Sequence, residues 1–277
     1  MLCQRIVTRN INDTIRAFEA LKVEGVDFAY AWVDGISKGA NFGKGAVEIA
    51  KFVDGPRDIG LIGRVDNKKV YGLKDSFFWG AIRGGWKVAH KLGLDKAAFA
   101  AFNSMRYSWL KNATNMETKP FSTYQFPIAG LLPNWNKRFI PNGLQEIQCF
   151  FSFAVFEEAF RKLVECCSRF DVYPELCAIR RLKADDAYLS FSGDGLCVTI
   201  DYDCNNRDPE KLYKMQRALA ETVIKYSGKI YLSKFPYLTA EECAAMYPKI
   251  NAFKEVKKQL DPNGVFQSAA SVRLGLS

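Results

Sequence analysis

The feature that most constrains the fold is an alternation of strand-like and helix-like segments between residues 144 and 232. Residues 196–202 alternate apolar and polar side chains, as a strand with one buried face does. Residues 155–170 instead carry apolar side chains three or four positions apart, which predicts an amphipathic helix. The predicted segments are strand 144–153, helix 155–170, strands 175–182 and 196–202, a helix from Pro209 to Gly228 with Asp208 as its cap, and strand 230–232.

This order, β-α-β-β-α-β, predicts an α+β fold with a ferredoxin-like core, in which an antiparallel sheet carries helices on one face. The first fifty residues add a further β-α-β-β that extends this core. Its predicted elements are strand 5–7, helix 12–23 capped by Asn12 or Asp13, and strands 27–33 and 45–53.

Two further regions have helical patterns. Residues 95–112 predict one helix. Near the C-terminus, Thr239 and Glu242 are spaced as a capping box, and Asp261-Pro-Asn-Gly264 ends the next helical run because proline cannot continue a helix. Residues 54–95, which precede both regions, interleave aromatic and basic side chains. This pattern fits a lid, a membrane-surface segment or ordinary packing of an irregular excursion.

Composition narrows the function classes without choosing one. Eight cysteines with no CxxC spacing and a single histidine do not match a zinc site, so we expect buried thiols in a reducing, cytoplasmic compartment and no metal. The glycine-rich residues 39–45 lack the spacing and the Ser or Thr of a nucleotide-binding loop. A net charge of +9 is compatible with nucleic acid, a phosphorylated substrate or peripheral contact with an anionic membrane.

The strand pattern predicts a polar patch on the face of the sheet that the helices leave free. In residues 196–202 the large apolar side chains should face the helices, which leaves Cys197 and Thr199 on the other side together with Asp201. Gln148 and Arg180 are expected on that same face from the neighbouring strands. Spacing alone does not distinguish a binding site from a solvated sheet face.

Several stretches resemble, in order, the FAD-linked oxidases of the vanillyl-alcohol-oxidase type. These stretches are Ala29-Tyr-Ala-Trp32-Val-Asp34, Ala101-Phe-Asn103 with Tyr107, Trp135-Asn136, Pro141-Asn-Gly143 with Gln148, Leu189-Ser-Phe191, Cys197-Val198, Tyr231-Leu-Ser-Lys234, Leu260-Asp-Pro-Asn-Gly-Val-Phe266 and Arg273-Leu-Gly-Leu276. The resemblance therefore covers most of the chain. Glu146 and Gly195 depart from it, standing where relatives have glutamine and asparagine.

The resemblance implies that the free face of the sheet covers a flavin and forms the substrate pocket. It implies that Lys234 is a catalytic residue that also contacts FAD, and that Tyr231 lies close to the flavin. The substrate-binding residues would be Trp32, Gln148, Arg180 and Cys197, with Cys197 a pocket wall rather than a nucleophile.

The resemblance also implies a domain division. Residues 1–228 would form the substrate-binding, or cap, domain of a two-domain flavin oxidase. Residues 229–277 would pack on an FAD-binding domain, which this sequence lacks and which another chain or an upstream region would supply. Alone, the chain is expected to bind FAD poorly and to be inactive.

The expected function is oxidation of a secondary alcohol of a sugar, polyol or lipid-linked sugar, with hydride transfer to flavin. The alternative is a non-catalytic binding or assembly protein that uses its ferredoxin-like sheet for an RNA or protein partner. The central strands carry no RNP1-like sequence of stacking aromatics, so a nucleic-acid partner is not expected.

Overall fold

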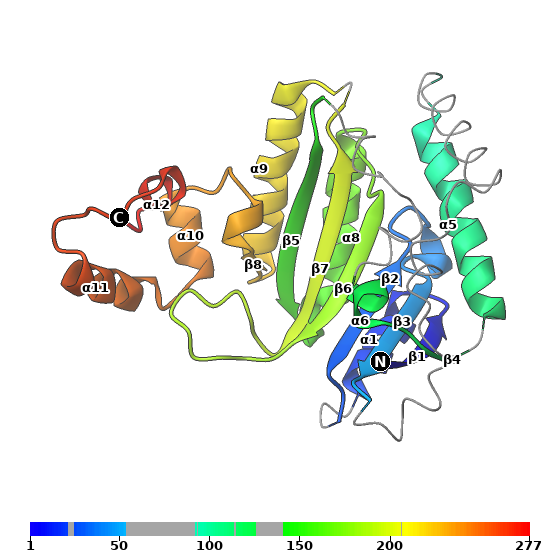
Figure 1. The fold of residues 1–277 in the computed structure, drawn as a ribbon. Helices are drawn as coiled ribbons and strands as arrows, with labels where there is room; N and C mark the ends of the chain where they lie inside the picture. The colour runs from blue at the N-terminus through cyan, green and yellow to red at the C-terminus, as the bar shows by residue number, and fades with distance from the viewer. Residues whose placement is uncertain (22–24, 54–91, 93, 114, 126–140, 206) are drawn as a thin grey trace. The chain divides into compact units, whose positions relative to one another are not determined.

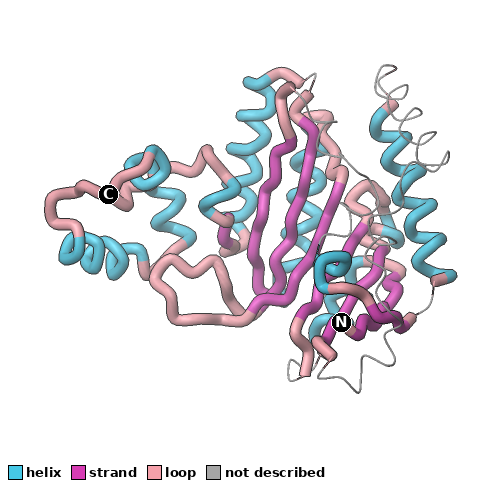
Figure 2. Tube along the Cα trace, in the orientation of Figure 1, coloured by secondary structure: helices cyan, strands magenta, loops and turns pink. Residues whose placement is uncertain are grey.

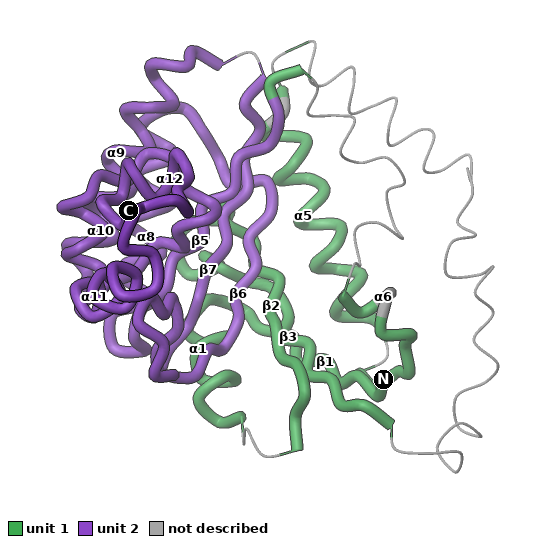
Figure 3. The backbone as a smooth tube through the Cα atoms, turned by 60° about the vertical axis from the view of Figure 1, so that its left-hand side comes forward, with its two compact units in different colours: residues 1–142 green, residues 143–277 purple. Residues whose placement is uncertain are grey.

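The structure, a computed structural model, describes residues 1–21, 25–53, 92, 94–113, 115–125, 141–205 and 207–277. Most of the interleaved aromatic and basic stretch lies outside these residues. The chain forms two compact units, Met1–Asn142 and Gly143–Ser277 (Figure 3). Residues 229–277 belong to the second unit, and their predicted packing on an FAD-binding domain stays a prediction.

The second unit has the predicted ferredoxin-like order (Figure 1). Its elements are β5 (Leu144–Ser152), α8 (Phe153–Arg169), β6 (Leu176–Leu182), β7 (Gly195–Asp203), α9 (Pro209–Lys225) and β8 (Lys229–Ile230). The strands lie in the order β6-β7-β5-β8, and each neighbouring pair is antiparallel. The α+β fold class predicted from the sequence is therefore confirmed.

Helices α8 and α9 cover one face of these strands (Figures 1 and 2). The alternation in β7 decides which face, because Val198 and Ile200 point toward the helices and are fully buried. The helices bury their apolar stripes on this face, with Phe156, Phe160, Leu163, Leu219 and Val223 all at zero exposure. Asp208 caps α9 by accepting a hydrogen bond from the backbone N–H of Glu210, as predicted.

The C-terminal part continues with short helices. These are the 3₁₀ turn η3 (Leu232–Lys234), α10 (Ala240–Met246), α11 (Ile250–Leu260) and α12 (Ala269–Arg273). The capping box predicted at Thr239 and Glu242 is present. Arg217 of α9 holds α10 through two hydrogen bonds to the Glu242 carboxylate, of 2.6 and 2.7 Å. The strand predicted at 230–232 is Lys229–Ile230 in the structure, because Tyr231 and Leu232 already belong to the cap and the start of the 3₁₀ turn.

The first unit repeats the same strand order with different helix placement. Its elements are β1 (Leu2–Thr8), α1 (Ile11–Glu19), β2 (Phe28–Val33), the 3₁₀ turn η1 (Gly39–Asn41), β3 (Gly45–Lys51), α5 (Asp95–Asn112), β4 (Met116–Thr118) and α6 (Phe121–Gln125). The strands lie in the order β4-β1-β3-β2. Asn10 caps α1 by accepting from the N–H of Asp13, so the predicted caps Asn12 and Asp13 were wrong.

Helices α1 and α5 lie on opposite faces of the first unit. Helix α1 packs on the face that carries Thr8, whose hydroxyl accepts a hydrogen bond from Thr14 at 2.9 Å. Helix α5 packs on the other face, where the Arg106 guanidinium lies 4.3 Å from the centre of the Trp32 ring. The alternation of the strands fixes this division, because Trp32 and Thr8 point to opposite sides of the sheet.

Gly45 allows β2 and β3 to pair closely. A Cβ built on Gly45 would overlap the backbone carbonyl oxygen of Trp32 and lie 2.9 Å from the Cα of Val33. We expect Gly45→Ala to lower the free energy of unfolding by about 2 kcal/mol, because backbone atoms cannot move away as a flexible side chain can. Urea denaturation measures the loss. Lys51→Ala, at an exposed position of the same strand, is the matched control, and equal midpoints for the two variants would contradict the prediction.

The structure gives the state of the cysteines and the character of the helices in the described residues. All eight cysteines are unpaired, and all except Cys204 are buried, as the sequence predicted. No helix in the described part of the chain has both the length and the apolar character needed to cross a membrane.

Candidate functional site

The strand register of the second unit brings the predicted polar residues together on one face. Three cross-strand rows run over β6, β7 and β5 on the side away from α8 and α9. The rows are Arg180, Cys197 and Phe150; Ala178, Thr199 and Gln148; and Leu176, Asp201 and Glu146. We call these nine residues the polar face. The predicted grouping of Gln148, Arg180, Cys197 and Thr199 is thus present in the structure.

Lys234 reaches the edge of the polar face from η3. Its Nζ lies 3.0 Å from Oε1 of Glu146, with 42% of the lysine side chain and 26% of the glutamate side chain exposed. The backbone carbonyl of Lys234 accepts a hydrogen bond of 3.1 Å from the Gln145 side chain. The sequence placed Lys234 at a strand end, but it closes a 3₁₀ turn, which directs its ammonium back toward β5.

Tyr231 is held beside the same edge by backbone and ring contacts. Its N–H donates to the carbonyl of Gln148 at 2.9 Å, and its carbonyl accepts from the N–H of Lys234. Its ring centre lies 5.3 Å from that of Phe191, and Phe191 packs in turn against Phe150. Tyr231 and Lys234 are therefore fixed at neighbouring positions by the end of β5.

Tyr247 holds this edge of the sheet through a buried hydrogen bond. Its ring is buried, and its hydroxyl donates a 2.7 Å hydrogen bond to the carbonyl of Ile230, directly before Tyr231. We expect Tyr247→Phe to lower the free energy of unfolding by about 1–2 kcal/mol, because a buried carbonyl loses its donor. Thermal or urea denaturation tests this against Tyr213→Phe, at a tyrosine that is 47% exposed. Equal losses in both variants would contradict the anchoring role.

The centre of the polar face is buried, although the sequence predicted an open face. Thr199 is 6% exposed and Asp201 7% exposed. Among the described residues, Oγ1 of Thr199 and Oδ1 of Asp201 have no hydrogen-bond partner. Such groups are uncommon in folded proteins and call for a specific explanation.

The electrostatics of this centre favour a neutral Asp201. Burial raises the pKa of Asp201 to about 8, and the nearby Glu146 and Glu175 carboxylates act in the same direction. Lys234 and Arg180 oppose the rise in pKa without cancelling it. At neutral pH Asp201 therefore carries a proton that it can donate.

Cys197 has the surroundings of a buried, neutral thiol. Its sulfur accepts a hydrogen bond of 3.1 Å from Nε2 of Gln148. Burial raises the pKa of the Cys197 thiol to about 11, so the thiolate is a minor species at neutral pH. Gln148, whose carbonyl also receives Tyr231, thus links the thiol to the edge of the sheet.

The other two predicted residues differ in their surroundings. Arg180 is exposed at the end of the row that contains Cys197. Trp32 lies in the first unit, where it is 4% exposed beneath Arg106. Burial lowers the pKa of Arg106 to about 10. The structure thus groups Gln148, Arg180, Cys197, Tyr231 and Lys234 in one unit and Trp32 in the other.

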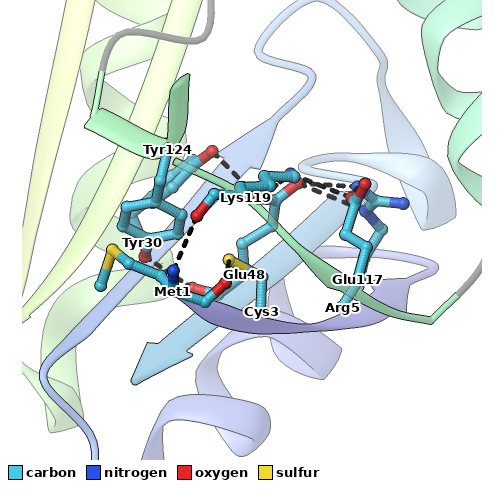
Figure 4. Close-up of polar contacts among 8 residues, drawn as sticks. All are labelled: Met1, Cys3, Arg5, Tyr30, Glu48, Glu117, Lys119 and Tyr124. Atoms are coloured by element: carbon cyan, nitrogen blue, oxygen red, sulfur yellow. Dashed lines mark hydrogen bonds and ion pairs between the residues drawn. The ribbon is translucent and has the colours of Figure 1, made fainter. Parts of the chain in front are cut away.

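The first unit contains a polar cluster whose members are mutually paired (Figure 4). Arg5 and Lys119 each bind both Glu48 and Glu117, at N–O distances of 2.8 to 3.1 Å. Burial alone would raise the pKa of Glu48, but the charges of Lys119 and Arg5 hold it below its ordinary value. Tyr30 donates to the same carboxylate at 3.3 Å. This internal pairing explains the cluster as a structural network that joins β1, β3 and β4.

The sequence did not single out Asp201 as a site residue or pair Glu146 with Lys234. Alternation placed Asp201 on the correct face, but its burial depends on what covers the strand. The contact between Glu146 and Lys234 joins residues 88 positions apart through a 3₁₀ turn. The signal available in the sequence was the run of polar residues at every second position of β5 and β7.

Comparison with known proteins places this site in context. Residues 149–274 match the family model of D-arabinono-1,4-lactone oxidase. This range includes most of the polar face together with Tyr231 and Lys234. The chain is also 25% identical to the decaprenylphosphoryl-β-D-ribose oxidase of Mycolicibacterium smegmatis over 279 residues, which are 98% of this chain and 56% of that protein. The motifs quoted above predicted a likeness to this oxidase.

Among solved structures, an alkyldihydroxyacetonephosphate synthase aligns with 95% of this chain and 44% of its own, at 10% identity and a TM-score of 0.39. The chain spans about half the length of the curated relative it matches. Both sequence matches are to oxidases. The resemblance predicted from the sequence is therefore confirmed, because the chain is similar to one of these oxidases over nearly its whole length.

Proposed function

We propose that this chain is the substrate-binding half of an FAD-dependent oxidoreductase, with the polar face of the second unit as its substrate pocket. The observation that carries the proposal is the convergence of Lys234, Tyr231 and Gln148 at one edge of a buried polar sheet face. The family match includes Tyr231 and Lys234, and the match to the curated oxidase spans 98% of this chain. The reaction would be oxidation of a secondary alcohol of a sugar, polyol or lipid-linked sugar.

The residues at this edge fit a flavin. Lys234 offers a half-exposed ammonium and Tyr231 a ring that is 38% exposed, which suit the carbonyl oxygens and flat surface of an isoalloxazine. Lys234 and Tyr231 would hold the cofactor, and Gln148, Cys197 and Arg180 would contact the substrate. FAD, when bound, would supply the hydride acceptor.

Lys234 has a defined task in this arrangement. Its ammonium would bind the hydroxyl group that is oxidised and stabilise negative charge that develops nearby, which is worth most where water is excluded. Glu146 would keep the ammonium pointed toward the face while the site is empty of substrate. The buried, neutral Cys197 would contribute to the shape of the pocket wall and would take no part in the chemistry.

A second polypeptide region would complete the enzyme. The curated relative is longer than this chain, which spans 56% of it. Leu260 and Phe266, at the end of α11 and beyond it, are 79% and 78% exposed. Exposed apolar side chains of this size mark interaction surfaces. We infer that residues 229–277 pack on an FAD-binding domain through this region.

Flavin binding tests the proposed function directly. The chain is purified alone and together with the polypeptide encoded immediately upstream, and bound flavin is measured by its visible absorbance. We expect a yellow complex with the upstream polypeptide and little or no flavin without it. Leu260→Ser combined with Phe266→Ser should weaken the complex. If no flavin is bound in either preparation, the proposed function is wrong, and a non-catalytic binding role takes its place.

A further inference from the structure

Two buried polar groups at the centre of the polar face have no protein partner among the described residues. They are the Thr199 hydroxyl and Oδ1 of Asp201, and both residues are more than nine-tenths buried. Leaving such a buried group without a hydrogen bond lowers the stability of the folded state. A folded protein accepts this cost where a ligand or an ordered water supplies the missing hydrogen bond.

The two groups are arranged to act together. Thr199 and Asp201 are two positions apart on β7, so their side chains leave the same face of the strand about 7 Å apart. Ala178 lies opposite Thr199 on β6, so the side chain across from the hydroxyl on that strand is a single methyl group. Gln148 and Glu146 flank the pair from β5. Thr199 therefore has hydrogen-bonding side chains beside it on β7 and β5 and a small side chain beside it on β6.

The chemistry of this position selects the ligand. A threonine hydroxyl and a carboxylic acid each donate and accept, as sugar hydroxyl groups do. Two carboxylates, Glu146 and Glu175, and two cations, Lys234 and Arg180, all act on Asp201, so this position has no excess of positive charge that would select a phosphate or carboxylate. The net positive charge of the chain is therefore not a guide to the ligand at this position.

We propose that Thr199 and Asp201 form a hydroxyl-binding subsite, which takes two neighbouring hydroxyl groups of an uncharged polyol such as a sugar ring. This inference rests on the proposed function, whose substrate class it narrows. A substrate that also carries a phosphate would place that group away from the buried Thr199 and Asp201, because a buried charge needs a paired partner. The subsite would set which sugar hydroxyl faces Lys234.

The test uses the full chain, purified with any FAD-binding polypeptide that it retains. The probes are a methyl pentoside and its monodeoxy analogues, titrated by calorimetry against the unsubstituted protein, Thr199→Val and Thr199→Ser. We expect Thr199→Val to weaken binding of the parent pentoside by about tenfold. One deoxy analogue should bind the unsubstituted protein and Thr199→Val equally, because the hydroxyl that Thr199 would meet is missing. Thr199→Ser keeps the hydroxyl and should retain the affinity.

The outcomes separate this subsite from the proposed function. Equal affinity of all three proteins for every probe, or no binding of any probe, overturns the subsite and leaves an ordered water as the partner of Thr199. Flavin reduction by polyols that is unchanged in Thr199→Val retains the proposed function and rejects the subsite. Binding that follows the expected pattern retains the subsite whether or not flavin is bound, and the test with the upstream polypeptide decides the oxidoreductase separately. Cooperative urea transitions in all three proteins confirm that the variants are folded.

Discussion

Replacing Lys234 by methionine is expected to slow substrate-dependent reduction of bound flavin by about 100-fold, or roughly 3 kcal/mol in activation free energy. The substitution keeps the length of the side chain and removes its charge. The ammonium lies 3.0 Å from Glu146 at the edge of the polar face, where the proposed function would bring substrate and cofactor together. Stopped-flow absorbance of the flavin-loaded assembly under anaerobic conditions measures the rate.

A structural role for Lys234 would give a different result. Its ion pair with Glu146 is partly exposed, so breaking it should change the free energy of unfolding by no more than about 1 kcal/mol. Lys225→Met, at an exposed position in the last turn of α9, controls for loss of a surface charge. A rate for Lys234→Met within threefold of the Lys225→Met rate would remove Lys234 from the chemistry.

Asp201 is expected to make the protein less stable as pH rises from about 4 to about 8. In the folded chain Asp201 keeps its proton up to a pKa of about 8, whereas in the unfolded chain it loses it near the ordinary value of 3.8. Between these values the folded state binds one proton more than the unfolded state. The free energy of unfolding should therefore fall by about 1.4 kcal/mol per pH unit from this group.

Asp201→Asn isolates the contribution of this carboxyl group. The amide keeps the shape of the protonated side chain and cannot ionise, so the difference in stability between the variant and the unsubstituted protein should grow in favour of the variant from pH 5 to pH 7.5. Urea denaturation at these two pH values measures it. Carboxylates with lowered pKa values, such as Asp13 and Glu242, titrate below this range. Parallel stability curves for the two proteins would show that Asp201 is already ionised at pH 5.

The sequence was sufficient to predict most elements of the second unit because each has a strong local cause. Asp208 and Pro209 fixed the start of α9, and Thr239 with Glu242 fixed the start of α10. In β7 the alternation of apolar and polar residues identified the face turned toward the helices. The predicted cap of α1 was wrong because Asn10, Asn12 and Asp13 are all suitable caps, and only the packing of Ile11 and Phe18 selects Asn10.

The sequence by itself determined which segments of the second unit are strands and helices, and it determined the caps of α9 and α10. It also determined the side of each strand on which Gln148, Thr199 and Asp201 lie. These features depend on periodicity and on neighbouring residues. The tertiary structure decided the rest. Register placed Asp201 opposite Glu146, a 3₁₀ turn brought Lys234 to that carboxylate, and tertiary packing buried the centre of the polar face. These three features depend on contacts between residues far apart in the chain, and so no local pattern could specify the protonated carboxyl group and the unpaired hydroxyl on which the proposed site depends.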